Sequence, residues 1–317
     1  MRRPGTASAA YFTNNVANTA VTLDTCTFDG YNGANAVWVV GDISGTSVFA
    51  LNRVVVSGTT PLRGFFHQGV LSGKLSVTDT VIGADAKGID VGTLTGGSID
   101  ISGGSVTQSG TGYEGILFQQ QITGPVSISD VTISSASTAI RIADLRAPLS
   151  LTNVVATASS AGKGLNIVAL TSAVTSIAIS GGSFTGVERG VSLPAVDAAT
   201  AISIAGARLD GTAGFALHFP SAVAGTVSIK GATCVAGGGA GVFFQTATLS
   251  AALVMEDTSV TATSTAIVIM GLQAPATFTN VVTSASDAAG GRGLLLGGTK
   301  TGVTVVISGG SFTGGST

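Results

Sequence analysis

The residues of this chain whose types could support catalysis are four charged side chains in its first half: Asp90, Glu114, Arg141 and Asp144. Two carboxylates beside an arginine could act as general acid and base in the cleavage of a sugar chain. The alternative is that these side chains are ordinary solvated surface charge. The sequence favours that alternative, so no catalytic residue is assigned and the four residues are candidates only.

Other reactive side chains are few and widely separated. His67, His218, Cys26 and Cys234 lack the spacing of a zinc site, so we expect no metal and no cofactor. Only 9% of the residues are charged and the net charge is −2, which argues against a nucleic-acid partner.

The elements that would position these residues are short and repeated. The octapeptide ISGGSFTG occupies 179–186 and returns at 307–314, and a near copy, ISGGSVTQ, occupies 101–108. A turn residue flanked by alternating apolar residues recurs at intervals of about 23 to 29 residues, where Gly, Asn and Asp suit a left-handed backbone. The expected turn positions are Thr25, Asn52, Asp79, Gly103, Asp130, Asn153, Gly181, Gly206, Gly231, Asp257, Asn280 and Gly309.

This pattern predicts an all-β fold, a parallel β-helix of about twelve coils with roughly 26 residues and three short strands per coil. Both cysteines align with inward positions, so both are expected to be buried free thiols. A longer match, of 137–155 with 264–282, indicates a five-coil super-repeat of about 127 residues.

We expect one solenoid over residues 1–317, with a partial coil at 1–20 and an incomplete last coil at 303–317. Solenoids need caps, and no capping helix is recognisable at either end. The chain is therefore expected to be a fragment of a longer repetitive protein, or to associate end to end.

The third strand of each coil carries a second candidate feature, a ladder of residues expected to point outward. Its members are Trp38, Phe66, Asp90, Leu117, Arg141, Asn166, Ser192, Ala216, Phe243, Val268 and Leu295. The large apolar members are expected to be exposed and to bind a protein or polysaccharide surface, or a second copy laterally. The expected binding residues are Trp38, Phe66, Leu117, Phe243, Val268 and Leu295.

Three alternatives remain open for these surfaces. Loops or Lys and Arg stems could cover the ladder, or its register could slip by one residue. Trp38 and Phe66 could stack on sugar rings. Outward Ser and Thr on the first strand form hydroxyl ladders, for which an ice-binding surface is a minor alternative.

The coil pattern resembles the right-handed parallel β-helix, or pectin-lyase-like, superfamily over nearly the whole chain. In character it is most similar to repetitive surface and adhesin-type members. The resemblance implies a right-handed coil, and polysaccharide binding or cleavage in some relatives. Polygalacturonase-like enzymes would show Asp-Asp, Gly-His-Gly and Arg-Ile-Lys motifs. Here the first two are missing, and in RIAD (141–144) Ala143 stands in place of the lysine.

The sequence therefore favours a non-enzymatic structural or adhesive rod, a segment of a larger surface or extracellular protein. The alternative is a polysaccharide-active lyase or hydrolase, or a degenerate relative of one.

Overall fold

The structure is a computed structural model that describes residues 8–29, 34–57, 62–171, 174–245, 248–287 and 290–315. Every regular element in these ranges is a β-strand. The same ranges contain no helix long and apolar enough to cross a membrane. The chain forms a parallel β-solenoid of right-handed type with about 11 turns. It divides into two compact units, Met1–Ser160 and Ala161–Thr317, which are described separately.

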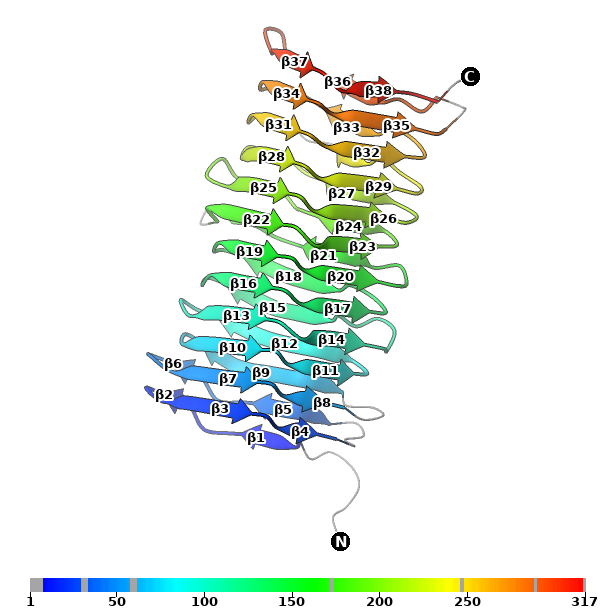
Figure 1. The fold of residues 1–317 in the computed structure, drawn as a ribbon. Coiled ribbons are helices and arrows are strands. Elements are labelled where there is room, and N and C mark those ends of the chain that lie inside the picture. The colour runs from blue at the N-terminus through cyan, green and yellow to red at the C-terminus, as the bar shows by residue number, and fades with distance from the viewer. Residues whose placement is uncertain are drawn as a thin grey trace. The chain divides into compact units, whose positions relative to one another are not determined.

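Unit 1 (Met1–Ser160) contains three parallel sheets, named A, B and C. Figure 1 shows strands of successive turns side by side within the unit. Sheet A contains β1 (Ala10–Phe12), β5 (Asn35–Val39), β9 (Arg63–Leu71), β12 (Lys87–Leu94), β15 (Ile116–Ile122) and β18 (Ile140–Leu145), with β2 (Val16–Ala17) and β6 (Ile43–Ser44) beside them. Sheet B contains β3 (Ala20–Asp24), β7 (Val48–Asn52), β10 (Lys74–Thr78), β13 (Ser98–Ser102), β16 (Val126–Ser129) and β19 (Leu149–Thr152). Sheet C contains β4 (Thr27–Phe28), β8 (Val55–Val56), β11 (Val81–Ala84), β14 (Ser105–Gln108), β17 (Thr132–Ser135) and β20 (Val155–Ala158).

Unit 2 (Ala161–Thr317) repeats this arrangement. Its sheet A contains β21 (Lys163–Ile167), β24 (Arg189–Ser192), β27 (Phe215–Phe219), β30 (Val242–Phe244), β33 (Ile267–Met270) and β36 (Leu294–Gly297). Its sheet B contains β22 (Ser176–Ser180), β25 (Ala201–Ala205), β28 (Thr226–Lys230), β31 (Leu253–Glu256), β34 (Ala276–Thr279) and β37 (Val305–Ser308). Its sheet C contains β23 (Ser183–Gly186), β26 (Arg208–Gly211), β29 (Thr233–Ala236), β32 (Ser259–Ala262), β35 (Val282–Ala285) and β38 (Ser311–Thr313).

Alternation of apolar and polar residues determines which side of each strand faces the core. In β13, Ile99 and Ile101 are buried and pair directly with Val126 and Ile128 of β16. The intervening serines and Asp100 point outward, because successive side chains of a strand alternate between its two faces. The predicted all-β fold, with inward residues stacked turn upon turn, is confirmed.

A left-handed residue connects sheet B to sheet C in each turn. Eleven of the twelve expected turn positions have a positive φ. The prediction of Asn52 is wrong, because the left-handed residue there is Arg53, with φ 52°. Buried Leu51 and Val54 flank the turn, so the inward residues, and not the turn preference of Asn, decide which residue adopts the left-handed conformation.

Residues about one repeat apart are in contact at these turns. The Asn153 side-chain amide donates a hydrogen bond to Asp130 Oδ1 over 3.1 Å, and Asn280 makes the equivalent bond to Asp257 over 3.0 Å. In the repeated octapeptide both glycines, Gly181 and Gly182, have positive φ. The repetition in the sequence therefore reflects one recurring turn.

His67 lies in the core of unit 1, where its protonation would destabilise the fold. It is fully buried on β9 between Val39 and Val91, and neither ring nitrogen has a hydrogen-bond partner. Burial lowers the pKa of His67 to about 4, although the Gly41 backbone and Asp42 act in the opposite direction.

We expect unfolding to become easier as the pH falls from about 6.5 to about 4. In that window the unfolded chain binds a proton that buried His67 does not, so stability is lost, by about 3 kcal/mol in total for this residue. Urea titrations at several pH values should show that the slope is reduced in a His67→Leu variant. Parallel stability curves for the two proteins would contradict this expectation.

The two cysteines are free, but only one is buried. Cys234 is fully buried on β29, as expected. The expectation for Cys26 is wrong, since it is half-buried. It precedes β4, which pairs only with β8 among the described strands, so one side of its turn is uncovered.

Native-state labelling with a thiol reagent should therefore modify Cys26 at least ~100-fold faster than Cys234. Burial, with a smaller contribution from Asp210, raises the pKa of Cys234 to about 12, so its reactive thiolate is scarce. Mass spectrometry after brief labelling should find one modified peptide. A Cys26→Ser variant should then resist labelling, and rapid modification of that variant would contradict the assignment.

Candidate functional site

The outer face of sheet A carries the predicted ladder, but most of that ladder is covered. In unit 1 the aligned residues are Tyr11, Trp38, Phe66, Asp90, Leu117 and Arg141. In unit 2 they are Asn166, Ser192, His218, Phe243, Val268 and Leu295. The expectation of exposure is wrong for Phe66, Leu117 and Val268, which are buried, while Trp38, Phe243 and Leu295 are half-buried. Surface binding by these residues stays a prediction.

One member of the ladder was placed incorrectly. Ala216 is fully buried, and His218 takes the outward position between Ser192 and Phe243. In this strand pattern the outward residue lies two positions after a small residue, as Asp90 follows Gly88. Both Gly214 and Ala216 could be that small residue. The inward pairing of Leu217 with Val191 shows that Ala216 is the correct one.

Aromatic rings and an arginine stem cover the first part of the ladder. Trp38 lies with its ring centroid 4.9 Å from Tyr11 and 6.0 Å from Phe66. The Arg63 guanidinium carbon lies 4.1 Å from the centroid of Phe66, a cation–π arrangement. An arginine side chain therefore covers the ladder at Phe66, with its guanidinium over the ring.

Asp90 is the most enclosed charged residue among the candidates, with no exposed area. Its Oδ2 lies 2.8 Å from Arg63 Nε and 3.3 Å from Lys87 Nζ. Gln119 Nε2 donates a hydrogen bond to Oδ1 over 2.5 Å. Oδ2 accepts no hydrogen bond, so its contacts with Arg63 and Lys87 are ion pairs. A buried carboxylate needs such partners to offset its lost hydration, so two ion pairs and one hydrogen bond explain why Asp90 can be covered.

The other three candidates form separate pairs. Arg141 Nη1 lies 3.5 Å from Glu114 Oε1, and Arg146 Nη2 lies 2.7 Å from Asp144 Oδ2. Leu117 separates Asp90 from Arg141 in the ladder. The structure thus divides the four candidates among three ion-paired groups.

A related cluster lies on sheet A of unit 2, centred on His218. Its ring stacks on Phe215 at 4.8 Å and on Phe243 at 5.5 Å, and its Nε2 is 2.7 Å from Gln245 Oε1. Burial lowers the pKa of His218 to about 4, so the ring is neutral near pH 7. The neighbouring turn supplies Arg189, whose Nη2 is 2.9 Å from Glu188 Oε1.

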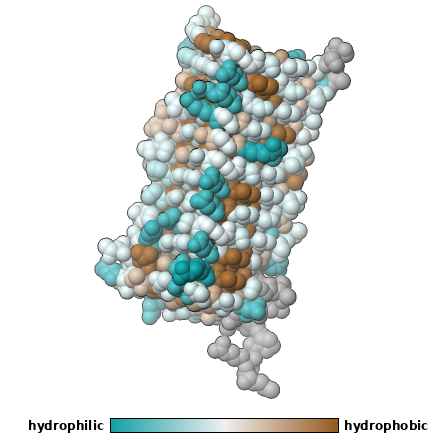
Figure 2. All heavy atoms as spheres, viewed as in Figure 1, coloured by the Kyte–Doolittle hydropathy of each residue, from teal (hydrophilic) through white to brown (hydrophobic). Residues whose placement is uncertain are grey.

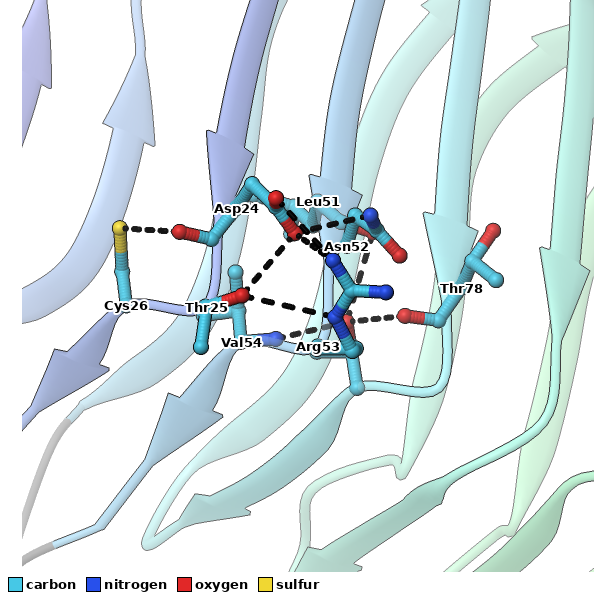
Figure 3. Close-up of polar contacts among 9 residues, drawn as sticks. Asp24, Thr25, Cys26, Leu51, Asn52, Arg53, Val54 and Thr78 are labelled. Atoms are coloured by element: carbon cyan, nitrogen blue, oxygen red, sulfur yellow. Dashed lines mark hydrogen bonds and ion pairs between the residues drawn. The ribbon is translucent and has the colours of Figure 1, made fainter.

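A polar cluster also occupies the corner between sheets B and C of unit 1 (Figure 3). Asp24 Oδ1 lies 2.8 Å from Arg53 Nη2 and accepts a hydrogen bond of the same length from Asn52 Nδ2. These side chains are about half exposed, so the pair adds little stability in water. Figure 2 shows such hydrophilic groups as separate patches on a weakly polar surface.

A shallow groove of about 310 Å³ lies at the corner between sheets A and B of unit 1. Glycines and hydroxyl residues of successive turns line it, together with Pro125 and Lys74, whose Nζ is 3.3 Å from Asp100. The described residues contain no group of three or more His, Cys, Asp or Glu that could hold a metal ion.

Sequence reasoning missed Arg63, Lys87 and Gln119, which make up the surroundings of Asp90. One available signal was the spacing of Lys87 and Asp90. Lys87 directly precedes the GIDV motif (88–91), and Asp90 lies within it, three residues later. Another was Gln119 in EGILFQ, which returns as Gln245 in AGVFFQ. No protein-family model, curated protein or solved structure matches the chain.

Proposed function

We propose that this chain is a non-enzymatic structural or adhesive β-solenoid, a segment of a larger surface or extracellular protein. The observation that carries the proposal is that charged side chains pair with one another within the chain. Ten Lys and Arg side chains among the described residues lie in ion pairs with the chain's own carboxylates. Several of these pairs join adjacent turns, as Arg63 with Asp90 and Lys230 with Glu256 do. Charge used in this way connects turns and leaves few ionic groups directed at a ligand.

The surface best suited to adhesion is the outer face of sheet C in unit 1. From β11 to β20 its outward positions hold only Val, Gly, Ser and Thr: Val81, Gly83, Ser105, Thr107, Thr132, Ser134, Val155 and Thr157. Val81 and Val155 are 44% and 39% exposed. The described outward positions of this face are uncharged, so a partner could cover it without burying an unpaired ion.

Adhesion can be tested with beads that carry the chain at equal density. Retention on protein-coated, polysaccharide-coated and apolar surfaces is expected to exceed that of bare beads on at least one surface. The double variant Val81→Lys/Val155→Lys should reduce that binding about tenfold, equivalent to ~1.4 kcal/mol. The matched control is Thr78→Lys/Thr152→Lys, which adds the same charge at the same three-turn spacing to the outward side of sheet B and should change little.

Retention equal to that of bare beads on every surface would overturn the adhesive role. Cleavage of a uronic-acid polymer would overturn the non-enzymatic assignment if it disappears in Arg141→Ala. That variant removes only a pair whose arginine is 39% exposed, so it should leave the fold intact.

A further inference from the structure

The clusters around Asp90 and His218 are duplicated versions of one site. Strand register makes Arg63 equivalent to Arg189, because each lies one turn before the central residue of its cluster. Gln119 and Gln245 each lie one turn after that residue and bond to it. The central residue differs, being Asp90 in unit 1 and His218 in unit 2.

Unit 1 shows how a carboxylate binds in such a site. The Asp90 carboxylate receives Arg63 Nε at 2.8 Å, Lys87 Nζ at 3.3 Å and the Gln119 amide at 2.5 Å. It therefore lies between a guanidinium and an amide that come from the turns before and after it. The Gln119 contact is a charge-assisted hydrogen bond, and Arg63 and Lys87 form ion pairs with the other carboxylate oxygen.

Unit 2 keeps the arginine and the amide but has no carboxylate in that position. Arg189 Nε is buried and has no hydrogen-bond partner. His218 is only 1% exposed, and because its neutral ring donates Nε2–H to Gln245, its unpaired Nδ1 is an acceptor and not a donor for a carboxylate. An unpaired buried donor costs about 1–3 kcal/mol, so an acceptor placed beside Arg189 Nε would be stabilising.

The surroundings of Arg189 are also rich in donors. Register places Lys163 beside Arg189 and Asn166 beside Ser192, and Arg189 Nη1 lies 3.5 Å from Ser192 Oγ. Ser192 takes the position that Phe66 holds in unit 1, so a small hydroxyl residue replaces an aromatic ring next to the guanidinium. The Arg189 side chain is 20% exposed although its Nε is buried, so a ligand meets the exposed part of the guanidinium first.

We propose that the Arg189–Ser192–His218 cluster binds the carboxylate of an external ligand at the Arg189 guanidinium, the counterpart of the Arg63 group that pairs with Asp90 in unit 1. The ligand is a small carboxylic acid, or an Asp or Glu side chain presented by another protein, which share the same chemistry. Glu188 competes with it, since this carboxylate lies 2.9 Å from Arg189 and 3.9 Å from Lys163 and is 45% exposed.

The chain supplies its own reporter for a test by NMR. It has only two histidines, and His67 belongs to the core of unit 1 and is not part of the cluster. Titration with sodium acetate, against sodium chloride at equal ionic strength, should shift the His218 ring signals saturably and leave those of His67 unchanged. An identical response to chloride, or no response of His218, would overturn the proposal.

Two adjacent substitutions should have opposite effects. Arg189→Gln is expected to weaken acetate binding at least ~10-fold, because it removes the charge-assisted donor. Glu188→Gln should tighten binding, because it removes the competing carboxylate. Equal acetate affinity in the wild type and both variants would contradict the assignment, whatever the absolute affinity is.

A third variant restores the arrangement of unit 1. In His218→Asp the new carboxylate should occupy the site, so the Arg189 Nε–H signal should no longer respond to acetate. An aspartate blocked at both ends as N-acetyl and amide distinguishes the two ligand sources. If acetate binds and the blocked aspartate does not, the ligand is a free acid; if both bind, a protein side chain can also be the ligand. A continued acetate response in His218→Asp would refute the comparison with unit 1.

Discussion

Replacing Asp90 with alanine is expected to lower the free energy of unfolding by about 3–5 kcal/mol, although Asp90 lies on the outer face of a sheet. The substitution leaves Arg63 and Lys87, whose side chains are only 25% and 17% exposed, without their shared carboxylate. It also removes the acceptor of the Gln119 amide. Breaking a buried ion pair from one side is costly because the remaining charge stays desolvated.

The matched control for this effect is Asp24→Ala. Asp24 also pairs with an arginine of the next turn at 2.8 Å, but the two side chains are 47% and 57% exposed. Its loss should cost no more than about 1 kcal/mol. Urea unfolding followed by circular dichroism measures both changes. Similar losses in the two variants would mean that burial does not determine how much an ion pair contributes to the free energy of unfolding.

Ile128→Asp is expected to have the largest effect of any single substitution considered, lowering the free energy of unfolding by about 5 kcal/mol or more. Ile128 is fully buried and pairs with Ile101 and Leu151 in the turns on either side. The substitution removes a large apolar side chain from the core and places an unpaired charge there. The protein should be expressed in a largely unfolded form or unfold at much lower urea concentration.

The neighbouring residue provides the control. Ser129 lies one position later on β16 and points to the opposite face, beside the uncharged Ser102 and Thr152. Ser129→Asp should therefore change the free energy of unfolding by less than ~0.5 kcal/mol, as surface substitutions usually do. If both variants were equally destabilised, the alternation that defines the core would be wrong.

The identification of the turn positions shows how far local patterns reach. Asp130 and Asn153 were both expected at turn positions one repeat apart, and in the structure a hydrogen bond joins their side chains. The same reasoning failed at Asn52, where a residue with a strong turn preference stands next to the true position, Arg53. Local preference identified the turn to within one residue, and the packing of Leu51 and Val54 decided between the two.

The candidate site was harder to predict from the sequence than the fold. Asp90 and Arg141 were recognised as outward-pointing charges, but their partners Arg63 and Glu114 come from other turns. Side chains as long as Arg and Lys can reach several positions in a neighbouring turn, so spacing alone does not determine which carboxylate they contact. The exposure expected for Phe66 was wrong for the same reason, since the Arg63 stem covers that ring.

By itself, the sequence determined the parallel solenoid, its repeat length and the inward residues, because strand alternation and left-handed turns are local properties that recur in every turn. Only the tertiary structure decided which outward residues are covered, that Asp90 is a buried ion-paired carboxylate, and that His218 stands in the equivalent position of unit 2. These outcomes depend on contacts between side chains of adjacent turns. Such contacts are set by side-chain length and strand register, and a repeat pattern specifies neither completely.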